Sequence, residues 1–240
     1  MAGHSQFKNI MHRKGAQDAK RAKIFTKLSK EISVAVKEGG DNPEFNPRLR
    51  TALMAAKDSN MPKDNIEKAI KKAIGGEHDN FEQITYEGYA PYGVAVIVET
   101  LTNNRNRTAS DIRAIFNKYN GNLGASGSVS FLFDHSGIIK FNKNKISFNQ
   151  LFEVAVKYDA KDVIEEEDSL LVITEPSDLY KITTNIANEL KIEVELSEFT
   201  FLAKTTVVLN KEQEDTVLKI INALEEHDDI QKVFSNAELT

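Results

Sequence analysis

The segment GIIKFNKNKISFNQLFEVAVKYDAKDVIEE, residues 137–166, begins the pattern that decides the fold. Its first residues, GIIKF, and its last, KDVIEE, predict strands, and SFNQLFEVAVKY between them predicts a helix capped by Ser147. The next stretches predict a strand (SLLVIT), a helix beginning at Pro176 (PSDLYKITTNIANELK) and another strand (IEVELSEF). Residues 137–199 therefore contain a complete strand–helix–strand–strand–helix–strand unit, which is the order of a ferredoxin-like plait.

The sequence on either side of this unit supplies the two halves of a second plait. The half before it is a strand at 93–101 (GVAVIVETL), a helix at 108–119 and a strand at 126–133 (SGSVSFLF). The half after it is a strand at 205–210 (TTVVLN), a helix at 212–227 and a strand at 230–235 (IQKVFS). We therefore predict one plait interrupted by another at a surface turn, where insertions are tolerated.

The first 75 residues carry the pattern of helices. Residues 16–37 contain neither Pro nor Gly, and the glycines at 39–40 predict a stop. Asn46-Pro47 predicts the N-cap and first turn of a second helix, and Pro62 begins a third that ends at Gly75-Gly76. Apolar residues recur at helical spacing and are expected to face one core: Phe25, Leu28, Ile32, Ala35, Val36, Leu49, Ala52, Leu53, Ala56, Ile66, Ala69, Ile70, Ala73 and Ile74.

The predicted fold class is therefore α+β, with an N-terminal three-helix domain followed by two ferredoxin-like α/β plaits, the second inserted into the first. We expect the helical domain to cover residues 1–76. The discontinuous plait is expected at 77–134 and 203–240, and the inserted plait at 135–202.

Several classes of chemistry find no support in the sequence. The chain of 240 residues contains no Cys, which excludes disulfides and thiol catalysis, and its five His residues lie in separate segments without ligand spacing. The acidic run at 165–168 falls where a hairpin turn is expected, so a solvated turn explains it better than paired catalytic carboxylates. The glycine-rich stretch 121–127 follows a helix and enters a strand, the reverse of a dinucleotide-binding loop. We therefore expect no enzyme activity, no metal and no cofactor.

The predicted sheets are also poor candidates for binding RNA bases. A plait binds single-stranded RNA when aromatic residues on its central strands stack on the bases. The strands predicted to be central read VAVIV and TTVVL and carry no ring. A basic helical segment is the better candidate.

Charge is divided unequally along the chain. The total is 31 Lys or Arg against 36 Asp or Glu, a net charge of −5, yet residues 1–75 hold 16 basic and 8 acidic residues. Such asymmetry indicates a segment that faces a polyanion. We predict nucleic-acid contacts from a list of basic residues: His4, Lys8, His12, Arg13, Lys14, Lys20, Arg21, Lys23, Lys27 and Lys30. The helical spacing of the last lysines predicts that they share one face of the first helix. A solvated helix face, or an intramolecular complement to the acidic remainder, is the alternative.

A second basic candidate is the stretch NNRNRTASD, residues 103–111. The guanidinium groups of Arg105 and Arg107 can form two parallel hydrogen bonds to a phosphate or a carboxylate. An equally compatible interpretation is a helix-capping loop with Thr108 as the N-cap.

Nothing in the sequence predicts a membrane span, because the longest apolar runs, such as Val94–Val98, have the length of strands. The N-terminus lacks the uninterrupted apolar stretch of a secretory signal, so we expect a cytoplasmic protein.

A series of motifs in order resembles the YebC/PmpR family. It comprises AGHSQFKNIMHRKGAQDAKRAKIFTKLSKEI, GGDNPEFNPRLRTAL, NMPKDNIEKAIKKA, YEGYAPYGVAV, NRNRT and NLGASGSVSFLF, from Ala2 to Phe133. Some residues depart from the family pattern: Phe7 replaces a common Trp, Gly15 a common Ala, and Ala90 and Tyr92 frequent glycines.

The resemblance implies a helical domain and two α/β domains, one of them discontinuous, without catalytic residues. Members of the family are DNA-binding transcriptional regulators or act on ribosomes, and a mitochondrial translational activator is a eukaryotic relative. We therefore predict a non-enzymatic gene-expression regulator that binds DNA through residues 4–30. A ribosome-associated translation factor that contacts ribosomal RNA is the alternative, because charge does not distinguish DNA phosphates from RNA phosphates. A third hypothesis is a protein-interaction module whose acidic α/β body binds the ribosome or another protein.

Overall fold

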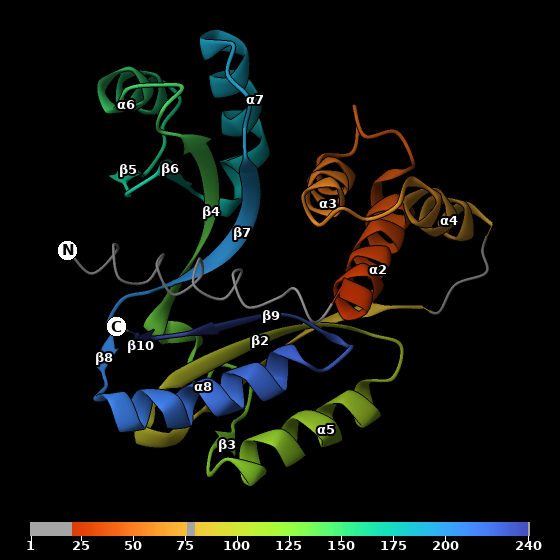
Figure 1. Ribbon diagram of the computed structural model, residues 1–240, viewed down its shortest axis with the longest axis vertical. Helices are drawn as coiled ribbons and strands as arrows, with labels where there is room; N and C mark the ends of the chain where they lie inside the picture. The colour runs from red at the N-terminus through yellow and green to blue at the C-terminus, as the bar shows by residue number, and fades with distance from the viewer. Residues whose placement is uncertain (1–20, 76–79, 240) are drawn as a thin grey trace. The chain divides into compact units, whose positions relative to one another are not determined.

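The computed structural model describes residues 21–75 and 80–239, which form two compact units (Figure 1). One unit comprises residues 133–202, and the other comprises the described residues before and after that segment. Because the second unit is made of two separate stretches of chain, the first is an insertion in it.

Residues 21–75 contain helices α2 (Arg21–Gly39), α3 (Pro47–Asp58) and α4 (Lys63–Ile74). The Asn46 side chain accepts a hydrogen bond from the Leu49 N–H and caps α3, and its amide group donates to the carbonyl oxygens of Ala35 and Gly40. One buried Asn thus caps α3 and also bonds to the C-terminal end of α2, and these contacts satisfy its side-chain amide.

The predicted apolar faces of these helices meet in one core, as expected. Ile32, Leu49 and Ala56 are completely buried there, with Phe25 and Leu28 packed at its edge. Ile74 is the correction, because its side chain is 61% exposed at the end of α4.

Beyond residue 80 the second unit contains an antiparallel sheet covered on one face by helices (Figure 1). The strands run in the order β3-β1-β2-β9. Their bounds, with those of the two helices, are β1 (Glu82–Tyr89), β2 (Ala95–Thr102), α5 (Arg105–Lys118), β3 (Asn122–Leu123), α8 (Lys211–Glu225) and β9 (Ile230–Ser235). A short 3-10 turn, η2 (Pro91–Gly93), joins β1 to β2.

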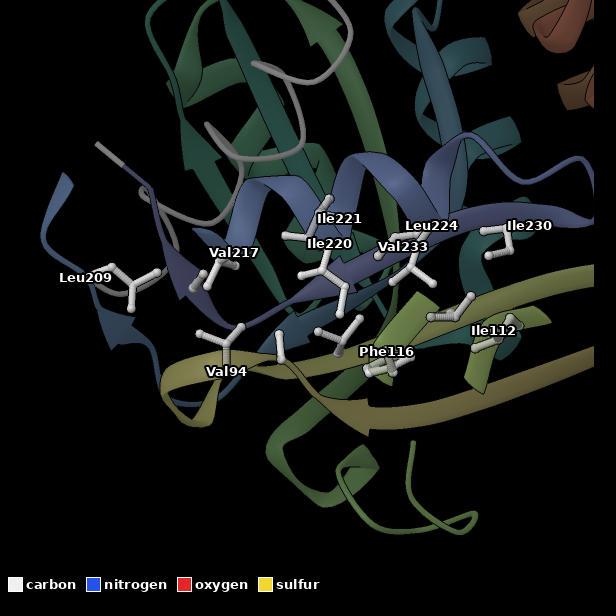
Figure 2. Close-up of a cluster of buried hydrophobic side chains, with 14 residues drawn as sticks. Val94, Ile112, Phe116, Leu209, Val217, Ile220, Ile221, Leu224, Ile230 and Val233 are labelled. Carbon is white, nitrogen blue, oxygen red and sulfur yellow. The ribbon is translucent and has the colours of Figure 1, made fainter. Parts of the chain in front are cut away.

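Helices α5 and α8 bury their apolar faces on this sheet. Figure 2 shows Ile112 and Phe116 from α5 and Ile220 and Leu224 from α8 pointing into one cluster, and all four are fully buried. The cluster also holds Val96 and Val98 of β2 together with residues of β9. It therefore joins segments from both sides of the insertion.

The strand beside β2 was not predicted. It is β1, which pairs with β2 along its whole length, from Glu82 opposite Thr102 to Tyr89 opposite Ala95. The stretch 205–210, expected to be a central strand, contributes only β8 (Val207–Val208), which pairs with β10 (Ala237–Glu238) in a separate two-stranded sheet. Because β1 carries Tyr86 and Tyr89, the expectation of central strands without rings was wrong.

The strand predicted at residues 126–133 is also wrong. The backbone N–H groups of Gly127, Val129 and Ser130 each donate at 2.8 Å to the carboxylate of Glu87, so they are not available to a strand ladder. This stretch turns instead and forms η3 (Ser130–Leu132). Burial opposes the charge of Glu87, but the backbone donors outweigh it and hold the pKa of Glu87 below its usual value.

The insertion, residues 133–202 with β7 running on to Ala203, contains the predicted strand–helix–strand–strand–helix–strand unit. Its elements are β4 (Phe133–Asn142), α6 (Phe148–Lys157), β5 (Asp162–Glu165), β6 (Ser169–Thr174), η4 (Pro176–Asp178), α7 (Leu179–Leu190) and β7 (Leu196–Ala203). The strand order β5-β6-β4-β7 is that of a ferredoxin-like plait, and both helices pack on one core. The α+β class, with helices before the sheets, is confirmed.

Candidate nucleic-acid interface

The lysines predicted to form one face of α2 do lie together, and they point at the end of α8. The Nζ atoms of Lys23 and Lys27 donate to the carbonyl oxygens of Glu226 (2.8 Å) and Glu225 (2.6 Å). The last carbonyl groups of a helix have no partner within it and carry its negative dipole end, so cations are stabilised there. These two lysines therefore fasten α2 to α8.

Lys30 continues the same face and reaches the carboxylate of Asp229. Its Nζ atom lies 2.7 Å from Asp229 Oδ1 and donates to the Asp228 carbonyl oxygen at 2.9 Å. The other carboxylate oxygen accepts from Arg107 Nη2 (2.9 Å) and from Thr108 Oγ1 (2.8 Å). The Asp229 side chain is only 6% exposed, so this ion pair lies largely out of water.

Burial alone would favour the neutral form of Asp229. The hydrogen bonds from Lys30, Arg107 and Thr108 outweigh that effect and hold the pKa of Asp229 far below its usual range. The carboxylate is therefore charged throughout the physiological pH range and joins α2, α5 and the α8–β9 turn.

Lys27 experiences the opposite balance. Burial lowers its pKa from the usual 10.5 to about 8, although Glu225 and Asp228 favour the charged form. A lysine so placed is largely withdrawn from solvent, which suits a structural contact better than a phosphate contact.

The two basic groups predicted separately meet at one pocket. Lys23 and Lys30 of α2 line it together with Asn103 and Arg107, around the ring of Phe81 and the α8–β9 turn, enclosing about 530 Å³. Lys30 Nζ lies 5.4 Å from the centroid of Phe81, within the range of a cation–π contact. The pocket combines cations with acidic groups, because Glu226, Asp228 and Asp229 also line it.

The loop before α5 differs in detail from its prediction. Asn104, not Thr108, is the N-cap of α5, and its side chain accepts from the Arg107 N–H at 3.1 Å. Thr108 is fully buried inside the first turn, where its hydroxyl binds Asp229. Arg105 is exposed and forms no ion pair within the part of the chain that the structure describes.

Six of the residues predicted to contact nucleic acid lie before the first described helix. His4, Lys8, His12, Arg13, Lys14 and Lys20 lie outside the described residues, and Arg21 begins α2. A basic surface that the sequence analysis did not single out lies on α4, where Lys63, Lys68, Lys71 and Lys72 are exposed. The signal for it was present in the spacing of EKAIKKA, where the lysines avoid the positions of the buried alanines.

The described residues were also compared with the geometry of a metal site and of a membrane-spanning helix. Across residues 21–75 and 80–239, no group of three or more His, Asp or Glu side chains is placed to hold a metal ion. In the same stretches no helix has both the length and the apolar character that crossing a membrane requires.

Two family models together match most of the chain. The family model for the TACO1/YebC protein N-terminal domain matches residues 5–76, and the model for the TACO1/YebC second and third domain matches residues 81–237. The chain belongs to the TACO1/YebC family. In this TACO1/YebC chain, the motif YEG contains Glu87, and the motif NLGASGSVS supplies the N–H groups that bind it. The motif NRNRT contains Asn104, Arg107 and Thr108, which cap α5 and bind Asp229.

Two relatives that are similar to this TACO1/YebC chain over its whole length share one name. A "Probable transcriptional regulatory protein" of Persephonella marina is 49% identical over 100% of this chain and 97% of its own length. Another, from Geobacter sp. strain M21, is 48% identical over the same shares. The crystal structure of a conserved hypothetical protein from Aquifex aeolicus is 47% identical, with a TM-score of 0.80 over 93% of this chain and 92% of that one.

Proposed function

We propose that this chain is a non-enzymatic regulator of gene expression that binds nucleic acid through the basic part before residue 76. The observation that carries the proposal is full-length similarity, at about half identity, to proteins named as probable transcriptional regulators. The excess of basic residues in that part of an otherwise acidic chain supports it, because phosphate contacts supply most nonspecific affinity for nucleic acid.

The contacts of α2 refine the list of residues. The Nζ atoms of Lys27 and Lys30 donate hydrogen bonds to carbonyl oxygens and to Asp229, so we assign these two lysines to holding α2 in place. Phosphate contacts are proposed for the residues before α2, namely His4, Lys8, His12, Arg13, Lys14 and Lys20. Phosphate contacts are also proposed for Arg105, which is exposed, and for Lys23 and Arg107, which line the pocket and stay exposed beside their contacts with Glu226 and Asp229. DNA-binding transcriptional regulation is the primary assignment, in accordance with the names of the relatives.

The test measures affinity for a duplex DNA and for a single-stranded RNA over a series of salt concentrations. In one variant Lys8, Arg13, Lys14 and Lys20 are replaced by Gln; in its control, the exposed lysines Lys181, Lys191, Lys211 and Lys219 are replaced instead. Each lost phosphate contact should make the log–log salt slope shallower by about 0.9 on duplex DNA or about 0.7 on a single strand.

We expect the first variant to lose slope and affinity and the control to keep both. Wild-type binding by both variants would reject the basic segment as the interface. Binding to RNA alone would move the assignment to the ribosome-associated alternative, and sedimentation with ribosomes in a sucrose gradient would then test it directly.

A further inference from the structure

Helix α6 of the insertion carries exposed apolar residues beside its buried face. The buried face places Leu151 and Ala155 in the core of the insertion. Phe152 and Val156 lie about 100° further round the helix and are 43% and 55% exposed. The side of α6 opposite the core is polar, as is usual for a helix that packs on one side, and its apolar surface is therefore wider than its core contact requires.

The two exposed residues continue a stripe that begins at Phe148, which is half-buried and also packs against the core of the insertion. Phe148, Phe152 and Val156 are spaced four residues apart, so they follow one another along the helix over about 12 Å. The rings of Phe148 and Phe152 stack with their centroids 5.7 Å apart. Two rings held in this way form a preformed apolar surface, which loses little conformational freedom when a partner binds.

The stripe leads into a shallow pocket with an acidic rim. Phe148 belongs to both, and Val163 and Ile164 complete the apolar floor of the pocket. The rim is formed by Asp162 and residues 165–167 at the β5–β6 turn. Lys143 is the cation of the lining, and its Nζ atom is paired with Glu165 at 2.8 Å. The rim therefore keeps a clear excess of negative charge.

We propose that this surface, the α6 stripe with the acidic pocket, docks a basic amphipathic helix of another protein. Apolar side chains at a spacing of three or four residues would lie along Phe148, Phe152 and Val156, as in other helix-in-groove complexes. Lys or Arg residues flanking them would face the acidic rim, which steers a cationic partner and sets its register.

Other occupants fit this surface less well. An added strand would have to pair with β5, a four-residue edge strand beginning and ending in acids, and such short charged edges disfavour strand addition. A second copy of this chain would have to offer a basic surface, such as α4 with its lysines and exposed Ile74, which belongs to the other compact unit. Contact between unlike surfaces of identical chains propagates into polymers unless it closes into a ring.

The experiment titrates the full-length chain into a fluorescent 18-residue peptide built from Leu at helical spacing with Lys elsewhere. A peptide of the same composition, scrambled to remove its apolar face, is the ligand control. The test variants are Phe152→Ser with Val156→Ser, and Asp162→Lys with Glu167→Lys. The matched controls are Phe131→Ser with Val208→Ser, which are 62% and 75% exposed, and Glu212→Lys with Asp215→Lys, both exposed in α8.

We expect each test variant to bind the helical peptide roughly tenfold more weakly than the wild type and each control variant to bind unchanged. Nucleic-acid affinity should stay the same in all of them, so this result does not depend on the proposed function. Equal binding of test and control variants, or equal binding of the scrambled peptide, would overturn the proposal. Self-association of the wild type that is lost in Phe152→Ser with Val156→Ser would also overturn it, in favour of a second copy.

Discussion

Replacing Asp229 with Asn removes the charge on which three elements converge. Lys30 would then keep a buried ammonium group, only 14% exposed, without its carboxylate partner at 2.7 Å. Removing one member of a buried ion pair costs about 3–5 kcal/mol. Because Arg107 is 50% exposed, water can replace its contact with Asp229, and the loss of that contact adds little. We therefore expect the unfolding free energy to fall by about 3 kcal/mol. For a chain of this size that lowers Tm by about 6–12 °C.

Hydrogen exchange measured by mass spectrometry locates the effect, because the chain has two compact units and a single melting curve would mix them. Protection should fall in α2, α5 and the α8–β9 turn and should stay unchanged in residues 133–202, which serve as an internal control. Asp228→Asn changes an exposed neighbouring carboxylate and should alter stability by less than about 0.5 kcal/mol.

The pH dependence supplies an independent check. Asp229 has a depressed pKa in the folded chain, so its contribution is complete above the unfolded pKa of about 3.9 and is lost as pH falls through the folded value. The difference in unfolding free energy between wild type and Asp229→Asn should be constant above about pH 5 and should shrink toward pH 3. Wild-type stability and exchange in Asp229→Asn would refute the central role of this carboxylate.

Two further predictions concern Lys27 and Tyr92. Between the folded pKa of about 8 and the usual 10.5, the unfolded chain binds more protons at Lys27 than the folded chain does. The unfolding free energy of the wild type should therefore rise with pH relative to that of Lys27→Met, by up to about 3 kcal/mol. Urea titrations from pH 7 to pH 10.5 measure it, and parallel pH curves for the two proteins would contradict the prediction. Tyr92→Gly should stabilise the chain by about 0.5–1 kcal/mol in thermal denaturation, because Tyr92 has φ of 65°. Tyr92→Ala keeps the strained backbone and should give no such gain.

Local sequence rules predicted most of the elements correctly. The caps at Asn46 and Ser147 and the apolar spacing of α2 lie within a few residues of the contacts they create, so a reader of the sequence can find them. The insertion was predictable for the same reason, because all its elements follow one another along the chain.

The predictions failed where contacts between residues far apart in the sequence determine the local structure. Residues 126–133 alternate like a strand, but their N–H groups bind Glu87, about 40 positions earlier. Segment 82–89 contains a Gly and several polar residues, and no strand was predicted there, yet it occupies the place beside β2 that was expected for residues 205–210. At the candidate site, the sequence placed Lys23, Lys27 and Lys30 on one face but could not reveal partners about 200 residues away.

The position of the insertion has a consequence for synthesis of the chain on the ribosome. The backbone enters and leaves the insertion side by side, with the Lys204 N–H donating to the Leu132 carbonyl oxygen at 2.8 Å. Strands β1 and β2 and helix α5 emerge first, but α8 and β9, which complete their core, emerge only after residues 133–202. At ordinary elongation rates, α8 and β9 emerge on the order of ten seconds after β2, and the apolar face of β2 is incompletely buried until then. The insertion can fold during that interval, so the sheet and core of the second unit are completed only after the insertion has formed.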